Sequence, residues 1–357
     1  GQIWESYQEL FQLFGTKQAI PAHPEQVYAL LVGINDYPMS LPSLRAPEND
    51  TLQFKAYLDR QPLPAETEIL SGAVTKENVI ETLTKIVEKA AAGDAVIFYF
   101  AGLGQKEQGP RLNDTIPAIL TFDQQRIPID EIVYLLCQDK DKALQPIIIL
   151  DMGVNAGISE ENRAARLIPK GIDAVGAARD WSNYQFGDQI QSMEAWGAFM
   201  QEASFVLMVG CDYDHESGLE DEQGSFFTRN LIEVLSRSRH FLPYPVLQER
   251  LTEVLSHQVP QTPDIRVEGP SHSMSSPNFL GQPSIDFQPM YGRVEWNRRL
   301  QRWTIDMGSR FGLHKQQVVH LCSADYKGNA LARIGFVYDD YSTLAFGDQL
   351  PNRSESY

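Results

Sequence analysis

Short runs of consecutive apolar residues, bounded by Gly, Pro and Asp, recur through much of the chain. The clearest are residues 27–32, 96–100 and 147–150. Uninterrupted apolar runs are typical of strands buried on both faces of a parallel sheet, because a half-exposed strand alternates with polar residues. The pattern therefore predicts a buried, mostly parallel sheet.

Helical periodicity separates these runs. Apolar residues recur at helical spacing from Val79 to Ala90, after Thr75 as a predicted N-cap. Asn49 and Asp50 are predicted to cap another helix by accepting from its free backbone N–H groups. Because strand–helix–strand alternation produces right-handed βαβ crossovers, we expect an α/β fold with helices flanking the sheet.

The two ends of the chain differ from this central part. Residues 1–24 show helical spacing and predict an N-terminal helical segment. Residues 269–280 are rich in Pro and Ser and predict a linker. Residues 281–357 predict a small β-rich domain, because short β-rich runs alternate with turn residues. Its expected strands are residues 303–306, 318–322 and 332–337.

Charge and cysteine content limit the classes of function. The chain has 30 basic and 47 acidic residues and a formal net charge of −17. Nucleic acids and anionic membranes both attract clustered Lys and Arg, so we expect neither as a partner. No apolar stretch approaches the length of a membrane span. Three scattered cysteines, Cys137, Cys211 and Cys322, suit neither a disulfide framework nor a CxxC metal site, and favour the reduced cytoplasm.

Two loops follow neighbouring predicted strands and should carry the function. The run at 96–100 ends in Ala101-Gly102-Leu103-Gly104, and the run at 147–150 leads into residues 151–157. In open parallel sheets, ligands bind where the carboxyl ends of the strands meet such loops. We therefore expect the functional site at this edge of the sheet.

These two loops resemble the histidine and cysteine loops of the caspase-like peptidases, in the metacaspase branch and its bacterial relatives. The family motifs are Ser-Gly-His-Gly and Asp-x-Cys-His-Ser-Gly. The histidine position is Leu103 and the cysteine position is Gly153, while Asp151 matches the motif aspartate. The resemblance covers about residues 25–268 and implies a caspase-like domain whose catalytic pair has been replaced.

The resemblance implies a protein that binds and does not cut. A cysteine peptidase needs a thiolate nucleophile and an imidazole, and Leu103 and Gly153 supply neither. We therefore expect a regulatory, scaffolding or peptide-binding protein, with an active caspase-like protease or its substrate as partner, in a bacterial defence or signalling system. In metacaspases the aspartate matching Asp151 helps to hold Arg or Lys. Basic-peptide binding is accordingly expected at Asp151, Asp212, Asp214 and Glu216.

Two alternatives remain open. The first is a cysteine endopeptidase with relocated chemistry, Arg/Lys specificity and Cys211 as nucleophile, with His215 four residues on as a possible base. The second is a scaffold whose β-rich domain recognises the partner. Association with an active protease favours the scaffold, whereas labelling of Cys211 by an electrophilic peptide favours the enzyme.

The remaining candidate residues are expected to be structural. Asn113, Asp114, Asp123 and Asp130 are candidate calcium ligands, but the D-x-D-x-D-G spacing is missing, so no metal or other cofactor is expected. His314 and His320 are too isolated for a metal site. The stretch 159–199 has little strand signal and predicts an exposed, protease-sensitive loop. Its basic residues would suit a processing protease; they are Arg163, Arg166, Lys170 and Arg179.

Overall fold

The computed structural model divides the chain into two compact units, residues 1–283 and 284–357. It describes residues 24–38, 41–61, 63, 65–108, 115–155, 167–176, 180–213, 216, 218–237, 242, 244–269, 279–281, 294–306, 308–309, 315, 318–322 and 329–346. The predicted N-terminal helix, apart from Pro24, lies outside these residues.

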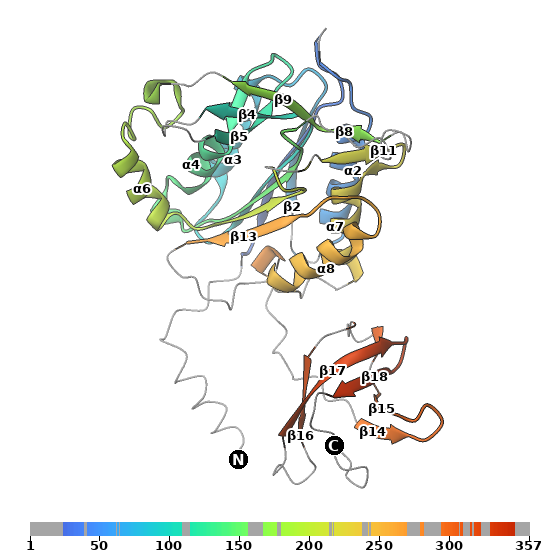
Figure 1. Cartoon of the computed structure of the whole chain (residues 1–357). Helices are drawn as coiled ribbons and strands as arrows, with labels where there is room; N and C mark the ends of the chain where they lie inside the picture. Colours follow the sequence, from blue (N-terminus) through green and yellow to red (C-terminus); the bar gives the residue numbers. More distant parts are fainter. Residues whose placement is uncertain are drawn as a thin grey trace. The chain divides into compact units, whose positions relative to one another are not determined.

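A six-stranded sheet forms the centre of the first unit (Figure 1). Its strand order is β13-β10-β7-β3-β1-β2, and every neighbouring pair is parallel except β10 and β13. The strands are β1 (Val27–Gly33), β2 (Ala65–Ser71), β3 (Ala95–Ala101), β7 (Gln145–Asp151), β10 (Phe205–Val209) and β13 (Asp264–Glu268). The predicted α/β fold with a mostly parallel sheet is confirmed.

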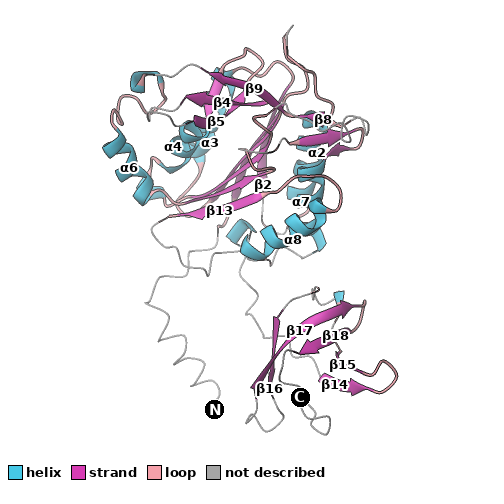
Figure 2. Ribbon diagram, in the orientation of Figure 1, coloured by secondary structure: helices cyan, strands magenta, loops and turns pink. Residues whose placement is uncertain are grey.

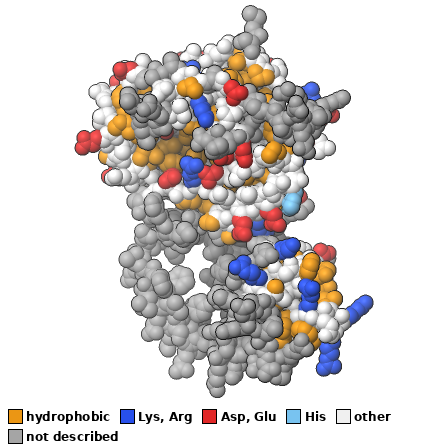
Figure 3. All heavy atoms as spheres, in the orientation of Figure 1, with side chains coloured by type: hydrophobic (Ala, Val, Ile, Leu, Met, Phe, Trp, Pro, Cys, Tyr) orange, Lys and Arg blue, Asp and Glu red, His pale blue; other side chains and the backbone are white. Residues whose placement is uncertain are grey.

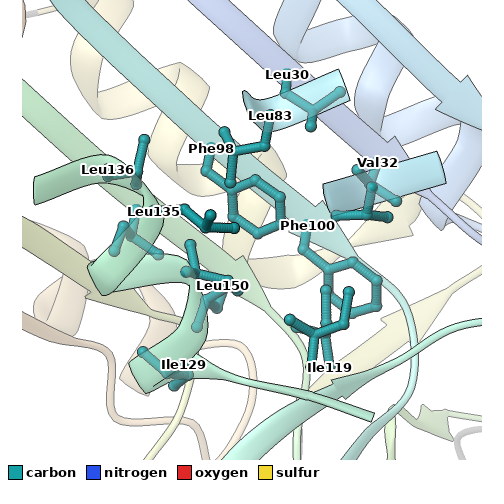
Figure 4. Packing of buried hydrophobic residues seen from close by; sticks show 14 of the residues in the cluster. Leu30, Val32, Leu83, Phe98, Phe100, Ile119, Ile129, Leu135, Leu136 and Leu150 are labelled. Atoms are coloured by element: carbon teal, nitrogen blue, oxygen red, sulfur yellow. The ribbon is translucent and has the colours of Figure 1, made fainter. Parts of the chain in front are cut away.

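Helices cover both faces of this sheet (Figure 2). Alternate residues of each central strand point to opposite faces, so an apolar core lies on each face of the sheet. Helices α3 (Lys76–Lys89) and α4 (Ile129–Cys137) pack on one face, where Phe98, Phe100 and Leu150 are buried (Figure 4). Helices α2 (Pro47–Leu58), α7 (Phe226–Arg237) and α8 (Tyr244–Ser256) pack on the other.

One predicted helix start is correct and the other is wrong. Thr75 caps α3 in a capping box with Asn78, as the sequence indicates. Helix α2, however, begins at Pro47, and its N-cap residue, Ala46, makes no side-chain capping bond. Proline suits the first helical turn because its missing N–H would have no intrahelical partner there. Asp50 consequently lies inside the helix, where its buried carboxylate is available for other contacts.

The stretch expected to be an exposed loop contains several regular elements. They are β8 (Ile168–Pro169), β9 (Gly171–Gly176), the 3₁₀ helix η2 (Trp181–Asn183) and α6 (Met193–Glu202). Lys170, between β8 and β9, is fully buried, so the expectation of an exposed loop is wrong for it. These strands pair with residues distant in sequence, and local periodicity therefore does not reveal them.

Two small sheets hold these short strands. Strand β9 joins a sheet of order β6-β5-β4-β9, and β8 joins one of order β12-β11-β8. Their other members are β4 (Gly104–Gln108), β5 (Thr115–Leu120), β6 (Arg126–Pro128), β11 (Leu219–Asp221) and β12 (Gly224–Ser225). Two further 3₁₀ helices are η1 (Lys140–Lys142) and η3 (Phe279–Gly281). Phe279 and Leu280, at the end of the predicted linker, are buried in the first unit against the cluster that contains Tyr57.

The second unit contains a five-stranded antiparallel sheet of order β14-β15-β18-β17-β16. Its strands are β14 (Val294–Asn297), β15 (Arg302–Ile305), β16 (Val318–Cys322), β17 (Asn329–Val337) and β18 (Ser342–Phe346). Trp303, Ile334 and Leu344 belong to its small core. The predicted small C-terminal β domain is confirmed.

The surface of the first unit carries charges of both signs. On the face that Figure 3 shows, Asp and Glu side chains lie among a few Lys and Arg side chains. Across the described part of the chain, the helices are too short or too polar to cross a membrane.

Candidate functional site

The loops that follow β3 and β7 touch each other. The two strands are adjacent and parallel, with Ala101 paired with Asp151 at their carboxyl ends. A Cβ atom on Gly104 would lie 2.2 Å from the carbonyl oxygen of Gly153, so the backbones are in direct contact and glycine is needed there. The structure thus brings the Leu103 and Gly153 loops together at the predicted edge of the sheet.

Leu103 contributes packing at this edge. Its side chain is fully buried in the core on the α3 and α4 face. Its backbone N–H donates to the hydroxyl of Tyr37 at 2.9 Å, and that hydroxyl donates to the carbonyl oxygen of Leu120 at 3.2 Å. Burial raises the pKa of Tyr37 well above its usual value, which keeps this hydroxyl protonated and available as a donor. The side chain of Leu103 therefore packs in the core and cannot transfer a proton.

A buried lysine lies next to the Gly153 loop. The Nζ atom of Lys170 is 3.0 Å from Oδ1 and 3.3 Å from the carbonyl oxygen of Asp151. It also lies 3.8 Å from Oδ2 of Asp50. All three side chains are at most 1% exposed. A third carboxylate, Glu220, is buried close enough to affect the pKa of Lys170. We call Asp50, Asp151 and Glu220 the acidic pocket.

Neighbouring groups fix two of these carboxylates. The hydroxyl of Thr228 donates to Oδ2 of Asp151 at 2.5 Å and shares a second hydrogen bond, of 2.6 Å, with the hydroxyl of Tyr99. The backbone N–H of Ser225 lies 3.4 Å from Oδ1 of Asp50. Oδ2 of Asp50 and Oδ1 of Asp151 are buried without a hydrogen bond among the described residues. Lys170 is the cation that faces both of these oxygens.

Glu220 is held by the start of α2. Its carboxylate accepts from the backbone N–H of Arg45 at 2.6 Å and from that of Ala46 at 3.3 Å. These donors precede the first turn of the helix, where backbone N–H groups lack intrahelical partners. One carboxylate thus caps a helix and faces the buried lysine.

Burial and charge shift the pKa values of the pocket. Burial raises the pKa of Asp50 to about 7, against the lowering effect of Lys170, while Asp151 and Glu220 raise it further. The pKa of Glu220 is raised in the same way. Burial alone would lower the pKa of Lys170, but the three carboxylates outweigh it, and the pKa lies above its usual value. The lysine is therefore an ammonium ion at neutral pH.

The backbone of Lys170 is held as firmly as its side chain. Its carbonyl oxygen accepts from the N–H groups of Gly104 and Gly153, both at 3.1 Å, and its own N–H donates to the carbonyl oxygen of Gly218 at 2.8 Å. Strand β8 pairs antiparallel with β11 on one side of Lys170, and β9 pairs parallel with β4 on the other. The segment therefore lies extended between two sheets.

A sequence model of the caspase domain, the C14 peptidase family, matches residues 26–271. The chain belongs to the caspase domain family. Among solved structures, a crystal structure of a protein from Geobacter sulfurreducens is similar, at 17% identity and a TM-score of 0.49, over 68% of this chain and 94% of that one. No curated protein matches the sequence.

The other predicted binding residues of the caspase domain lie on the loop after β10. The carboxylate of Glu216 accepts from the backbone N–H of Thr262 at 2.5 Å and from its hydroxyl at 2.8 Å. The backbone N–H of Asp212 lies 3.3 Å from the same carboxylate. Asp214 lies outside the described residues. Glu216 thus connects its own loop with the segment that precedes β13.

The described cysteines of the caspase domain are poor nucleophiles. Cys211 is fully buried, its thiol donates to the carbonyl oxygen of Met152, and burial followed by nearby carboxylates raises its pKa strongly. Burial raises the pKa of Cys137 to about 12. A reactive thiol needs a lowered pKa and access to solvent. His215, the possible base for Cys211, lies outside the described residues.

No group of His, Cys, Asp and Glu residues suited to a metal ion occurs in the described ranges. Asp123 accepts from the backbone N–H of Lys76 and from the hydroxyl of Thr121, so its carboxylate has a structural role. Asp130 lies in the first turn of α4. The candidates outside the described residues are Asn113, Asp114, Arg163, Arg166, Arg179 and His314, and the side chain of His320 is likewise not described.

Sequence reasoning missed most of the acidic pocket. It identified Asp151 from the family motif, treated Asp50 as a helix cap, and left Glu220 unassigned within the run Leu219-Glu220-Asp221-Glu222. Lys170 was placed on an exposed loop. The sequence feature that could have indicated a buried lysine is a single basic residue within the apolar stretch Leu167-Ile168-Pro169-Lys170-Gly171-Ile172. A lysine is almost never fully buried unless it is paired, so its burial there would have implied acidic partners.

Proposed function

We propose that this caspase domain is catalytically inactive and works by binding, as a regulatory, scaffolding or peptide-binding protein. The observation that supports the proposal is the placement of Leu103 and Gly153 side by side where the family resemblance puts the catalytic pair. A thiolate attacks the substrate carbonyl in such enzymes, and an imidazole moves the proton to the leaving amine. Loss of either group typically costs several orders of magnitude in rate.

The scaffold around the missing pair is intact. The two loops meet at the carboxyl ends of β3 and β7, and the backbone donors at Gly104 and Gly153 converge on one carbonyl oxygen. An inactive domain that keeps this arrangement of loops remains suited to recognition. We therefore expect a protein partner, either an active caspase-like protease or its substrate, in the reducing cytoplasm of a bacterial defence or signalling system.

A peptidase assay tests the inactivity directly. The purified full-length chain is incubated with fluorogenic peptides that carry Lys or Arg before the cleaved bond, with and without added calcium. We expect no turnover above buffer. Turnover that disappears in a Cys211→Ala variant would instead support the relocated chemistry. Turnover unchanged by that variant would require another nucleophile and would equally overturn the proposal.

A pull-down from native cells tests the binding role. The chain serves as bait, and captured proteins are identified by mass spectrometry. Enrichment of an active caspase-like protease, followed by a change in that protease's rate when this chain is added, is the expected result. If a purified candidate protease neither binds the chain nor changes its rate, that protease is excluded as the partner.

A further inference from the structure

The acidic pocket has the chemistry of a site for a primary ammonium group. Two buried carboxylates, those of Asp151 and Asp50, lie 3.0 Å and 3.8 Å from the ammonium nitrogen of Lys170, and a third, that of Glu220, is close enough to raise its pKa. Buried carboxylates are strongly disfavoured as anions without a cation beside them, so a pocket of this kind favours a positively charged occupant. The hydroxyl of Thr228 and the N–H of Ser225 bind the opposite oxygens of Asp151 and Asp50, which aims the remaining oxygens at the lysine.

The peptide bond after Lys170 lies where a peptidase of this architecture would hold its substrate. Two backbone N–H groups converge on the Lys170 carbonyl oxygen, from Gly104 and Gly153. Converging backbone donors on a carbonyl form the oxyanion hole of acyl-transfer enzymes, in which the nucleophile's own N–H commonly takes part. Here the donors belong to the nucleophile position and to the residue after Leu103.

The segment on both sides of Lys170 pairs with neighbouring strands, as a bound peptide does when it adds to a sheet. Ile168 and Pro169 form an antiparallel ladder with Glu220 and Leu219. After Lys170, Gly171 pairs with Gly104 in β4. Strand addition to an existing sheet edge is a common mode of peptide recognition. A Cβ atom on Gly171 would lie 2.3 Å from the carbonyl oxygen of Asn155, so this segment fits closely against the Gly153 loop.

We infer that Lys170 is a built-in ligand of the acidic pocket, and that residues 168–172 cover the edge of the sheet where β3 and β7 end. The inference deepens the proposed function and rests on it, because the site is taken to hold the Lys170–Gly171 bond without cutting it. A tethered occupant has an effective concentration of about millimolar or more. A basic peptide from outside therefore enters only if residues 168–172 withdraw.

Chemical rescue of a lysine-truncated variant tests the inference. Lys170→Ala removes three methylene groups and the ammonium, and n-propylammonium supplies the same atoms. We expect n-propylammonium to raise the melting temperature of the variant by about 3 °C at ten times its dissociation constant, and to leave the unmodified chain unchanged. n-Propanol and tetramethylammonium at equal concentration serve as controls, since one lacks the charge and the other lacks N–H donors.

Lysine acetylation of the unmodified chain gives a second measurement that needs no folded variant. Mass spectrometry after limited acetylation should show Lys170 modified at least tenfold more slowly than the exposed Lys85, with the difference lost in denaturant. Equal modification of the two lysines in the native state would overturn the inference. So would a shift of melting temperature that is the same in the variant and the unmodified chain.

Failure of the inference is distinguishable from failure of the proposed function. Hydrolysis of external Lys peptides by the unmodified chain would overturn both the inactivity and the cover by residues 168–172. Absence of hydrolysis, combined with no rescue by n-propylammonium and rapid acetylation of Lys170, would overturn only the built-in ligand. A Lys peptide that binds the unmodified chain as tightly as Lys170→Ala would likewise contradict the cover by residues 168–172 and leave the inactivity untouched.

Discussion

The ammonium nitrogen of Lys170 lies 3.0 Å from a carboxylate oxygen of Asp151, and both side chains are completely buried. An ion pair in this setting is costly to form, since both ions lose their hydration, and costly to break, since one charge is then left alone. The pair also joins two segments, the end of β7 and the link between β8 and β9. It therefore connects the sheet edge with the segment that covers it.

Asp151→Ala should destabilise the first unit severely. The substitution leaves the Lys170 ammonium without its nearest carboxylate, and loss of one partner of a buried pair typically costs about 3–5 kcal/mol. Urea unfolding should report this loss. Glu81→Ala is the matched control, because it breaks a pair with Lys85 on the exposed surface of α3 and should leave the unfolding midpoint unchanged. Similar effects of the two substitutions would contradict the burial of the pair.

The contribution of Asp50 to stability should fall as the pH rises from about 4 to about 7. The pKa of Asp50 is raised from 3.8 to about 7, so the folded state binds this proton more tightly than the unfolded state does. Stability is then greatest below pH 4 for this group and is lost as the pH rises toward 7, by at most about 1.4 kcal/mol per pH unit. The groups that face Asp50 are Lys170, Asp151, Glu220 and Tyr99.

Asp50→Asn isolates this effect from the histidines that titrate in the same range. The raised pKa of Glu220 acts in the same direction as that of Asp50. The ammonium of Lys170 stays charged throughout the range, because its pKa is raised above its usual value. The difference in unfolding free energy between the variant and the unmodified chain should therefore depend on pH between 4 and 7 and level off above 7. A constant difference would contradict the raised pKa.

Thr228→Val should weaken the acidic pocket without changing its charge. The hydroxyl donates to Asp151 and is bonded to the hydroxyl of Tyr99, and valine keeps the shape while removing both bonds. A buried acceptor that loses its donor costs about 1–3 kcal/mol. Tyr99→Phe is the control, because it removes only the outer bond and should cost less. Urea unfolding should show a larger loss of unfolding free energy for Thr228→Val than for Tyr99→Phe. The reverse order would contradict the view that the Thr228 hydroxyl stabilises Asp151.

The two cysteines of the caspase domain, Cys137 and Cys211, should react slowly with thiol reagents. Burial raises the pKa of Cys137 to about 12 and raises that of Cys211 further, so little thiolate is present at pH 8. Iodoacetamide labelling followed by mass spectrometry should show both cysteines protected in the native protein and labelled in denaturant. Rapid native labelling of Cys211 would contradict its burial and would support the alternative of relocated chemistry.

The sequence predicts the fold well and the site only in part, for physical reasons. Buried parallel strands such as Val27–Gly33 carry their signal locally, as uninterrupted apolar runs. Lys170 carries no such signal, because its burial depends on Asp50 and Glu220, which lie far away in the chain. Proline at the start of α2 displaced the predicted cap and left Asp50 inside the helix. Charge pairing across distant elements is a property of the folded state.

Gly171→Ala should disturb the fit of residues 168–172 against the Gly153 loop, whereas Gly197→Ala should not. A Cβ atom at position 171 would lie 2.3 Å from the carbonyl oxygen and 2.5 Å from the backbone nitrogen of Asn155, so backbone must move to admit it. Overpacking of this kind typically costs about 1–3 kcal/mol. Gly197→Ala in α6 is the matched control: no atom lies within 4 Å of its Cβ, and alanine favours a helix by about 1 kcal/mol.

The readout for this pair combines stability with lysine protection. Gly171→Ala should lower the unfolding midpoint and speed acetylation of Lys170, because residues 168–172 no longer fit against the Gly153 loop. Gly197→Ala should raise the midpoint and leave the acetylation of Lys170 unchanged. If both variants keep Lys170 fully protected, the close fit of Gly171 against Asn155 does not hold the lysine in its pocket, and the ion pair with Asp151 alone retains it.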